Sequence, residues 1–519
     1  MDGGWADLHP WRVDRCSGEP LFRQLYVQIR QSIQARSLRL GARLPSTRQL
    51  ATRLGISRTS AICAYEQLIA EGWLVSRKGS GAYVCDDLPE AFALPGSQSA
   101  ALAPAAGTYV PDRENLFGPL TLSDEPGDSR PFTMGLCLID ARTADAWRRL
   151  THRSVRSMAP CHFGYTDPRG LPQLRSAICD YLRAARAVRC DPDQVIVMGG
   201  AQHAIDLATS VLLQSGDQVW VEDPCYPMTY RGLVGAGLQP CPVPVDTHGL
   251  DVGAGVRAAP QAKAAVVTPS HQYPTGAVLS MARRLELLAW ARASGAWIIE
   301  DDYDSELRYR GRPLASLQGL DEAGRVIYVG TLNKVLFPGL RIGYLVAPHD
   351  QLPRLVDTRR LGDRQPPTLS QTVLADFMAE GHLTAHFRRM RQLYRRAQDV
   401  LIGELTARVG PGRLQFRSPD QGNHLVIWLP EGVSDVALER AARDRGVTCR
   451  AVSRLYLNAP ARPGLMLGFT GYQPDSLAGP AARLGGLIAE SLDRCGGIAA
   501  LDQPQDQPGR RGVALEHDG

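Results

Sequence analysis

The chain has 519 residues, of which 44% are hydrophobic and 21% are charged, a balance typical of a soluble globular protein with two folded domains. Its 11 cysteines form no C-x-x-C pair and no regular His/Cys spacing, so we expect neither a metal site nor a disulfide framework, and the reduced cytoplasm is the expected location. A net charge of +5 marks no strongly basic or acidic chain, and without a long apolar run or a secretory N-terminal pattern we expect neither a membrane-spanning nor a secreted protein.

The N-terminal segment has the pattern of helices separated by a tight turn. A first helix is expected over residues 20–38. Ser46 then stands where it can cap a short helix that ends at Gly55, a residue type that tolerates a left-handed exit. Ser57 can cap again, before a helix over residues 58–70 with apolar side chains at core spacing. This order is that of a helix-turn-helix.

Two strand-like runs follow, at residues 73–75 and 82–84, and the Gly-rich stretch between them predicts a hairpin wing. The positive charge of the chain also lies here. Residues 1–85 carry 12 Lys/Arg against 6 Asp/Glu, a net charge of +6, so the remaining 434 residues sum to −1. Such an excess is the electrostatic mark of a polyanion-binding module, although a solvated basic helix face looks the same on charge alone.

Four motifs in residues 20–84 together resemble the winged-helix DNA-binding domain of the GntR superfamily: P-L-x-x-Q-L, L-P-S-x-R-x-L-A, G-[IV]-S-R-x-[ST] and E-G-W-L. The resemblance implies double-stranded DNA as a partner. Groups at a helix N-terminus can donate to phosphates, and Arg can read guanine. The implied DNA contacts are Arg48, Arg58, Thr59, Ser60, Arg77 and Lys78. The alternative is a winged helix that contacts another protein.

Two segments have a composition that cannot bury enough apolar surface to fold. Residues 86–128 are rich in Pro, Ala, Gly and Ser and are predicted to be a flexible linker, and residues 496–519 are predicted to be a disordered tail. The chain then divides into a DNA-binding domain over residues 1–85, the linker, a large effector domain over residues 129–495, and the tail.

The large domain alternates apolar strand-like runs with helical segments. The runs lie at residues 194–198, 218–221, 264–268, 296–299, 326–329 and 342–346. This alternation predicts an α/β fold, with a largely parallel sheet covered by helices on both faces. The ligand of such a sheet is expected at the C-terminal ends of its strands.

Three motifs stand at these predicted strand ends. G-G-A-Q at residues 199–202 opens a helix whose first N–H groups can bind a phosphate, although a Gly pair also serves a plain tight turn. Tyr226 follows the next run, where an aromatic could stack on a planar ring or simply belong to the core. The acids within residues 300–306 follow an apolar strand, where a carboxylate could keep a pyridinium nitrogen protonated.

Lysine is rare in this chain, because only three of the 58 basic residues are Lys. Arg cannot form an imine, whereas a Lys amine can condense with an aldehyde. Lys78 lies in the Gly-rich turn and Lys263 just before an apolar strand, which leaves Lys334, directly after the run at 326–329, as the best Schiff-base candidate.

The order and spacing of these motifs resemble fold-type I enzymes that use pyridoxal 5′-phosphate, the aspartate aminotransferase fold. Y-T-D-P-R-G at residues 165–170 and T-P-S-H-Q-Y-P-T-G at 268–276 belong to the same resemblance. With the winged helix in front, the chain resembles the MocR subgroup of GntR-type regulators. The resemblance implies pyridoxal 5′-phosphate as the cofactor, attached to Lys334 as an aldimine.

Further roles are implied by the resemblance, position by position. Asp301 would be the partner of the pyridine nitrogen, Tyr303 of the phenolic oxygen, and Tyr226 would stack on the ring. Tyr165 would reach in from a second subunit, so a homodimer is implied. The phosphate would lie among residues at two strand ends, namely Gly200, Ala201, Gln202, Thr331 and Arg341.

The sequence departs from the aminotransferase pattern at three places. Tyr273 stands before P-T-G where those enzymes usually carry Asn, as is usual in the regulator subgroup, and Asn333 stands before the lysine where Ser is common. The Arg that usually clamps a carboxylate near the last strand is missing from L-M-L-G-F at residues 465–469. Three nearby alternatives are left unranked, namely Arg450, Arg454 and Arg462.

Two functions follow. The first is a pyridoxal phosphate-dependent transcriptional regulator, not an enzyme, that senses a small amine, an amino acid or the cofactor itself through an aldimine at Lys334. The second is a true aminotransferase with an appended DNA-binding domain. We favour the first, because a basic DNA-binding head would be superfluous in a metabolic enzyme and motifs suited to imine formation do not require turnover.

Overall fold

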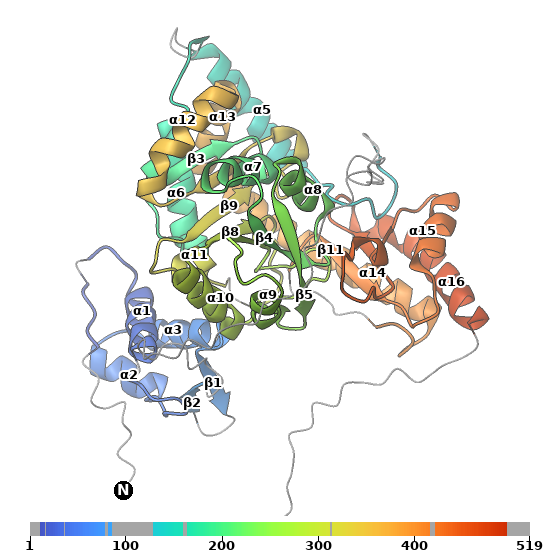
Figure 1. Ribbon diagram of the computed structural model, residues 1–519, viewed down its shortest axis with the longest axis horizontal. Coiled ribbons are helices and arrows are strands. Elements are labelled where there is room, and N and C mark those ends of the chain that lie inside the picture. The colour runs from blue at the N-terminus through green and yellow to red at the C-terminus, as the bar shows by residue number, and fades with distance from the viewer. Residues whose placement is uncertain are drawn as a thin grey trace, which may run out of the picture.

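The computed structural model describes residues 11–15, 17–35, 37–77, 81–85, 128–158, 163–311, 314–415 and 421–495. Figure 1 shows three folded parts: an N-terminal unit in blue, a central α/β body, and a C-terminal part in orange and red. The predicted tail, the predicted linker up to residue 127, and Lys78 lie outside the described residues. Within these ranges, no helix is both long and apolar enough to cross a membrane.

The N-terminal unit, residues 11–85, contains α1 (Leu21–Gln34), α2 (Thr47–Leu54), α3 (Arg58–Ala70) and the antiparallel strands β1 (Leu74–Arg77) and β2 (Gly81–Val84). The predicted caps are confirmed: Ser46 accepts from the backbone N–H of Gln49 at 3.2 Å, and Ser57 from that of Ser60 at 3.0 Å. Gly55 ends α2 with a φ of 64°, in the left-handed region. The predicted helix-turn-helix and wing are therefore present.

The first helix is shorter than predicted. It ends at Gln34 instead of residue 38, because the chain turns at Ala35 and the N–H of Leu38 bonds to the carbonyl of Ser32. This turn brings Leu38, only 2% exposed, into the core of the unit. Leu38, which extended the apolar helical pattern in the sequence, therefore packs into the core from a loop.

In the described part of the chain, eight strands form the central sheet. Their spatial order is β3 (Val195–Met198), β10 (Gly343–Val346), β9 (Val326–Thr331), β8 (Trp297–Asp302), β7 (Ala264–Val267), β4 (Gln218–Asp223), β5 (Gln239–Asp246) and β6 (Gly249–Leu250). The six predicted runs are all strands of this sheet. β5 escaped prediction because three prolines interrupt its apolar pattern, and Pro is tolerated there because only the short β6 lies beyond it.

The sheet is largely parallel, as predicted, but it is mixed because β10 and the short β6 run in the opposite direction. β4, β5, β7, β8 and β9 run parallel, but β10 is antiparallel to both β3 and β9. The reason lies in the connection between β9 and β10, residues 332–342. A parallel crossover needs a dozen or more residues and usually a helix, so this shorter link reverses the chain.

Helices cover both faces of the sheet, as predicted. Val219 and Val221 of β4 pack in one apolar cluster with α7, whereas Trp220 between them packs in another with α9 and α10. The helices around the sheet are α5 (Ala141–Arg156), α6 (Pro172–Arg186), α7 (Ala201–Leu212), α8 (Pro227–Gly235), α9 (Val252–Ala258), α10 (Met281–Ser294), α11 (Leu317–Leu320), α12 (Leu352–Gly362) and α13 (Thr368–Ala379).

The C-terminal part forms a smaller antiparallel sheet in the order β11 (His424–Trp428), β13 (Gly464–Gly468) and β12 (Arg450–Ala451), with helices α14 (His382–Val409), α15 (Asp435–Asp444) and α16 (Ala478–Arg494). Asp223 at the end of β4 ties this part to the body, because its carboxylate accepts from the N–H groups of residues 457–459 at 2.6–2.8 Å. The C-terminal end of β4 therefore lies against the segment between β12 and β13.

The N-terminal unit packs on α10 and α11 of the body (Figure 1). Leu285 of α10 and Leu320 of α11 are part of the same buried cluster as the core of the N-terminal unit. The side chain of Arg23 in α1 also donates to the carbonyl of Arg183 in α6 at 2.8 Å. The two parts thus share one apolar core.

Candidate cofactor and DNA-binding sites

The start of α3 presents the residues predicted to contact DNA. Ala61, Ala64 and Leu68 bury one side of this helix, which leaves Arg58 and Thr59 exposed in its first turn. Ser60 is instead half-buried, and its hydroxyl lies 2.9 Å from that of Ser57 in the cap. Arg58 and Thr59 are therefore available to a DNA backbone or base edge, while Ser60 mainly holds the helix start.

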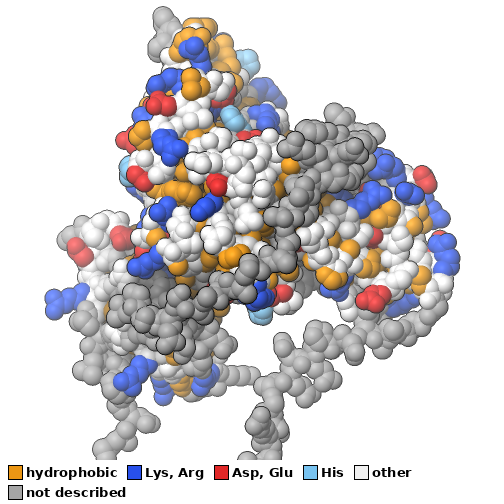
Figure 2. Space-filling model, viewed as in Figure 1, with side chains coloured by type: hydrophobic (Ala, Val, Ile, Leu, Met, Phe, Trp, Pro, Cys, Tyr) orange, Lys and Arg blue, Asp and Glu red, His pale blue; other side chains and the backbone are white. Residues whose placement is uncertain are grey.

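Arg48 in α2 and Arg77 in β1 are also exposed, and the guanidinium of Arg77 lies 4.6 Å from the ring centre of Tyr83. On the face seen in Figure 2, basic side chains lie along the edge of the N-terminal unit that points away from α10 and α11. The wing and α2 thus extend the basic surface that begins at α3, on the side free of the body.

Lys334 lies in a rigid turn at the end of β9. The N–H of Leu336 bonds to the carbonyl of Leu332 at 2.9 Å, and the N–H of Leu332 bonds to that of Ile342 at 3.0 Å. Lys334 is half-buried. A methyl group built on Gly135 would lie 2.6 Å from Lys334 Nζ, so any side chain at position 135 would displace the amine from its observed position.

The start of α7 is a candidate anion site. Gly200 precedes the helix, and among the described residues no side chain caps its first N–H groups. Uncapped N–H groups and the helix dipole favour a phosphate. The side-chain amide of Gln202 donates to Asp206 at 2.9 Å, so the candidate anion donor of Gln202 is its backbone N–H.

Asn333 and Arg341 complete a cradle around Gly200. A methyl group on Gly200 would lie 2.9 Å from Asn333 Nδ2 and 3.5 Å from Arg341 Nη1. Asn333 is fixed there, because its Oδ1 accepts from the N–H of Ile342 at 3.0 Å and its own N–H bonds to Thr331 Oγ1 at 3.2 Å. Arg341 adopts a φ of 51°, in the left-handed region that is uncommon for non-glycine residues.

The acids Glu300, Asp301 and Asp302 at the C-terminal end of β8 differ in their hydrogen bonds. Glu300 accepts from the N–H groups of Leu317 and Gln318 at the start of α11, at 2.9 and 3.0 Å. Asp302 accepts from Arg186 at 2.7 Å. One buried oxygen each of Asp301, Asp302 and Glu306 has no hydrogen bond from the described residues, but Asp302 and Glu306 are engaged through their other oxygen, whereas no hydrogen bond to Asp301 is observed among those residues. Burial raises the pKa of Asp301 to about 7, while the charge of Lys334 acts in the opposite direction.

Tyr303 lies on the same side of β8 as Asp301. Its hydroxyl lies 3.1 Å from His271 Nδ1, which in turn lies 2.9 Å from Asp304 Oδ2. Burial raises the pKa of Tyr303 well above its ordinary value, with Asp304, Tyr273 and Asp301 adding to the effect. Tyr303 is therefore a neutral phenol beside the candidate ring-nitrogen partner.

Tyr226 and Tyr273 form the aromatic wall of this region, with ring centres 5.2 Å apart and planes at 77°. Tyr226 stands at the start of α8 and is half-buried. The hydroxyl of Tyr273 accepts from Arg450 Nη1 at 2.7 Å. The C-terminal part thus contributes a buried guanidinium to the same wall.

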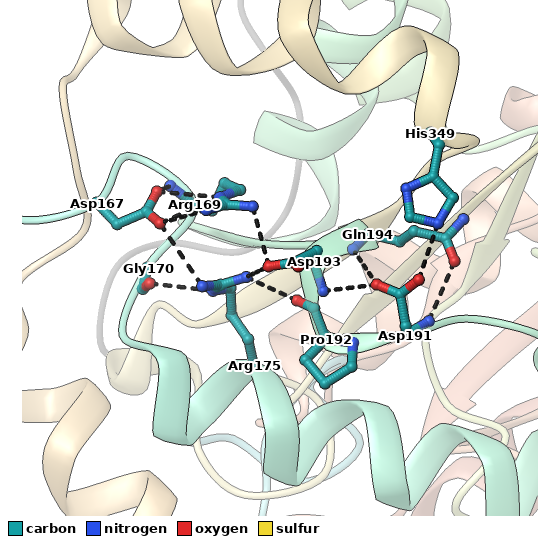
Figure 3. A network of polar contacts seen from close by, with 9 residues as sticks. All are labelled: Asp167, Arg169, Gly170, Arg175, Asp191, Pro192, Asp193, Gln194 and His349. Atoms are coloured by element: carbon teal, nitrogen blue, oxygen red, sulfur yellow. Dashed lines mark hydrogen bonds and ion pairs between the residues drawn. The ribbon is translucent and has the colours of Figure 1, made fainter.

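Tyr165 does not join this group, because it is 79% exposed and packs under the guanidinium of Arg364. Its loop is anchored by the polar network in Figure 3. Arg169 pairs with Asp167 at 2.8 Å, and the buried Arg175 donates to Gly170 and Pro192 carbonyls and pairs with Asp193 at 3.1 Å. The loop is therefore held firmly, with Tyr165 turned outward.

The structure thus brings together all of the sequence-predicted cofactor residues except Tyr165. Sequence reasoning missed Gly135 and His271, which contact Lys334 and Tyr303. Gly135 carried no usable signal, since it is one of 51 glycines. His271 stood inside the motif at 268–276 but had no assigned role.

Two family models match the chain, one described as "Bacterial regulatory proteins, gntR family" over residues 21–84 and one as "Aminotransferase class I and II" over residues 134–464. The probable rhizopine catabolism regulatory protein MocR of Rhizobium meliloti is 38% identical, with 90% of this chain and 93% of that protein covered. The pyridoxine biosynthesis transcriptional regulator PdxR of Corynebacterium glutamicum is 34% identical, with 88% and 93% covered. A crystal structure of an archaeal alanine:glyoxylate aminotransferase matches with a TM-score of 0.63 at 26% identity, covering 70% of this chain and 90% of that one.

Proposed function

The chain belongs to the MocR-type transcriptional regulators, in which a GntR-family DNA-binding domain precedes a class I and II aminotransferase domain, and from this premise we propose that it senses a small amine. In this proposal the effector displaces Lys334 from pyridoxal phosphate, and the exchange changes how the N-terminal unit is held on DNA. The observation that carries the proposal is the packing of the N-terminal unit on helices that are tied to the cofactor site.

The class I and II aminotransferase fold binds pyridoxal phosphate, and the residues present here fit that group. Gly200, Asn333 and the uncapped start of α7 offer a cradle for its phosphate, and the buried Oδ1 of Asp301 offers an acceptor for its ring nitrogen. When bound, the cofactor supplies an aldehyde that condenses with a primary amine. The protein holds the anion, keeps Asp301 buried, and fixes the Lys334 amine at the end of a rigid turn.

Release of Lys334 changes the local charge. If an effector amine took its place, the Lys334 amine would be released beside Asp301 and His424, two groups whose pKa values respond to a charge at this position. Burial is the larger influence on both. A change of charge in this half-buried region is a local event, and the elements packed around it can convert it into a change elsewhere in the protein.

The path to the N-terminal unit runs through α10 and α11. Arg284 of α10 is 1% exposed and donates to the carbonyls of Pro269, Leu279 and Ala315 at 2.8–3.0 Å. Pro269 begins the loop that carries His271 and Tyr273, so Arg284 ties the docking helix to one side of the site. α11 is tied to another side, because Glu300, the neighbour of Asp301, holds its first N–H groups.

A buried carboxylate of the N-terminal unit meets the same arginine. Glu71, at the end of α3, is 2% exposed and accepts from Tyr26 at 2.6 Å. Burial raises the pKa of both Glu71 and Glu300, and the guanidinium charge of Arg284 acts on both in the opposite direction. The charge of Arg284 therefore acts both on Glu71 at the end of α3 and on Glu300 in β8, the strand that carries Asp301.

We also propose a homodimer in which Tyr165 completes the partner's site. The large apolar side chains that are exposed among the described residues of the body lie in or near α5 and α12 along the chain, and they are Ile139, Val155, Phe163, Tyr165 and Leu361, from 42% to 88% exposed. Exposed apolar side chains that form a contiguous patch mark association surfaces. Tyr165 itself lies on a firmly anchored loop, which suits a residue that reaches into another subunit.

A regulatory role without steady turnover agrees with the site. Tyr273 replaces the Asn usual in aminotransferases, and its hydroxyl is engaged by Arg450. The two relatives described above are named as regulators of two different metabolic processes, rhizopine catabolism and pyridoxine biosynthesis. The identity of the effector therefore has to come from binding experiments.

The test uses full-length protein loaded with pyridoxal phosphate and a DNA fragment selected in vitro for binding to it. Amines and amino acids are first screened for a change in cofactor absorbance, and DNA affinity is then measured by fluorescence anisotropy with and without each hit. We expect the hits to change DNA affinity. Hits that leave DNA affinity unchanged, together with steady transamination of a keto acid, would instead support an aminotransferase.

A further inference from the structure

His271 is a buried histidine beside Tyr303. It is 1% exposed and lies in the loop that follows β7. Its ring is tightly packed, because a methyl group built on Gly422 would collide with Cε1 and one built on Gly276 would lie 3.3 Å from Nε2. On another side the ring centre of His424 lies 4.8 Å from that of His271. The ring therefore has little freedom to move.

Nδ1 of His271 has two close neighbours. Asp304 Oδ2 lies 2.9 Å from it, and the hydroxyl oxygen of Tyr303 lies 3.1 Å from it. The same Oδ2 atom accepts from the backbone N–H of Asn423 at 3.2 Å, so it acts as an acceptor. A bare ring nitrogen is also an acceptor, and two acceptors at hydrogen-bond distance repel each other. The ring proton of His271 therefore lies on Nδ1 and is donated to Asp304.

The second ring nitrogen agrees with this assignment. Nε2 is buried and has no hydrogen bond from the described residues. A proton on Nε2 instead of Nδ1 would leave a buried donor without an acceptor, and it would also deprive the Asp304 carboxylate of a donor. Each of these losses is unfavourable in a buried site, so the geometry selects the Nδ1 proton.

The Nδ1 proton limits the direction of the Tyr303 hydroxyl. An N–H group cannot accept a hydrogen bond, so Tyr303 cannot donate to His271. Among the described residues, no other hydrogen bond of this hydroxyl is observed. Burial raises the pKa of Tyr303 well above its ordinary value, so the hydroxyl keeps its proton. The proton is therefore available to an acceptor on the side away from His271.

We propose that His271 is a positioning residue, which together with Asp304 turns the hydroxyl proton of Tyr303 toward the phenolic oxygen of bound pyridoxal phosphate. This inference rests on the function proposed above, because it requires the cofactor at Lys334. A donor at the phenolic oxygen stabilises its negative charge, and that charge would otherwise hold the imine proton more strongly. His271 thus acts through Tyr303 on the pH at which the imine loses its proton.

The test is a pH titration of the imine absorbance in full-length, cofactor-loaded protein. In Tyr303→Phe the donor is lost, so the pH midpoint should rise by about one to two units. His271→Leu keeps a comparable volume but leaves the Asp304 carboxylate free to accept from Tyr303, so the midpoint should rise by about half a unit to one unit. His271→Asn is the matched control, because its amide nitrogen can take the place of Nδ1 and donate to Asp304. It should keep the wild-type midpoint.

Other titratable and charged groups surround His271 and Tyr303 from several elements. They are Glu222 of β4, Asp301 of β8, Lys334 after β9, His424 of β11, Arg450 of β12 and Tyr273 of the same loop. All of them are present in every protein of the comparison. A difference between His271→Leu and His271→Asn therefore reports on the Nδ1 donor.

The outcomes separate this inference from the proposed function. Equal midpoints in wild type and His271→Leu, or equal shifts in His271→Leu and His271→Asn, would overturn the role of His271 and leave the sensor intact. A wild-type protein that forms no imine band with pyridoxal phosphate would contradict both.

A second measurement covers the case in which His271→Leu does not fold or load cofactor. Nitrogen NMR of wild-type protein with isotopically labelled histidine distinguishes a protonated from a bare ring nitrogen, and the spectrum of His271→Asn identifies the signals of His271. We expect the proton on Nδ1 both without and with the cofactor. A bare Nδ1 with the proton on Nε2 would overturn the proposal, because Tyr303 could then donate to His271.

Discussion

Gly200 offers a direct way to perturb the proposed phosphate cradle. Its φ of 131° and ψ of 175° lie in a region that is essentially reserved for glycine. In Gly200→Ala the added methyl group would lie 2.9 Å from Asn333 Nδ2 and 3.5 Å from Arg341 Nη1, in the space proposed for the anion. The substitution therefore strains the backbone and displaces at least one donor from the phosphate.

The expected magnitude follows from these two effects. The strained backbone costs about 1–3 kcal/mol of folding free energy. Loss of one hydrogen bond to a charged group costs about 1.5–3 kcal/mol, which weakens binding of pyridoxal phosphate by roughly 10- to 150-fold. The measurement is an absorbance titration of the cofactor-free protein with pyridoxal phosphate and, separately, with pyridoxal. Pyridoxal has no phosphate, so its affinity should change much less.

Gly216→Ala is the matched control. Gly216 has a φ of 91° and no atom within 4 Å of the added methyl group, and it lies in the turn before β4, at the opposite end of the strand from the site. It should lower the Tm without changing either affinity. The reasoning is refuted if Gly200→Ala binds pyridoxal phosphate normally, or if it weakens pyridoxal and pyridoxal phosphate by the same factor.

Three further substitutions test other parts of the account. Arg58→Ala should weaken DNA binding and lower the salt dependence of log K by about one unit per decade of salt, with an unchanged cofactor spectrum, whereas loss of both would contradict separate sites. Asp301 keeps its proton up to a pKa of about 7 in the folded protein, whereas the unfolded chain releases it above 3.8. The Tm of cofactor-free protein should therefore fall as the pH rises between these two values, and it should fall less steeply in Asp301→Asn. An equal slope in both proteins would argue against the buried acid. Glu71→Gln should reduce the ratio of DNA affinities with and without effector, while the exposed Glu66→Gln on the same helix should not; an unaltered ratio in both would exclude the path through Arg284.

Features governed by local chemistry could be predicted from the sequence. The Ser46 and Ser57 caps and the left-handed exit at Gly55 depend on a few adjacent residues, so their positions were correct. Lys334 stood out because lysine is rare here and because it follows a buried strand. The parallel strands were found by their continuous apolar runs, and their C-terminal ends then located the candidate site.

Features that depend on pairing between distant segments could not be predicted in this way. The direction of β10 depends on the length of the link after β9, and Gly135 matters only because the fold brings it against Lys334. The docking of the N-terminal unit on α10 and α11 joins residues more than 200 positions apart, and no local pattern records it.

The most direct test of the central claim compares wild-type protein with Lys334→Ala in the presence of the selected DNA fragment. Each is titrated with DNA in the absence and presence of an amine that changes the wild-type cofactor absorbance. We predict that Lys334→Ala binds DNA, lacks the imine absorbance band, and shows the same DNA affinity with and without the amine, whereas wild type responds. A Lys334→Ala protein whose DNA affinity still responds to the amine as wild type does would contradict sensing through this lysine.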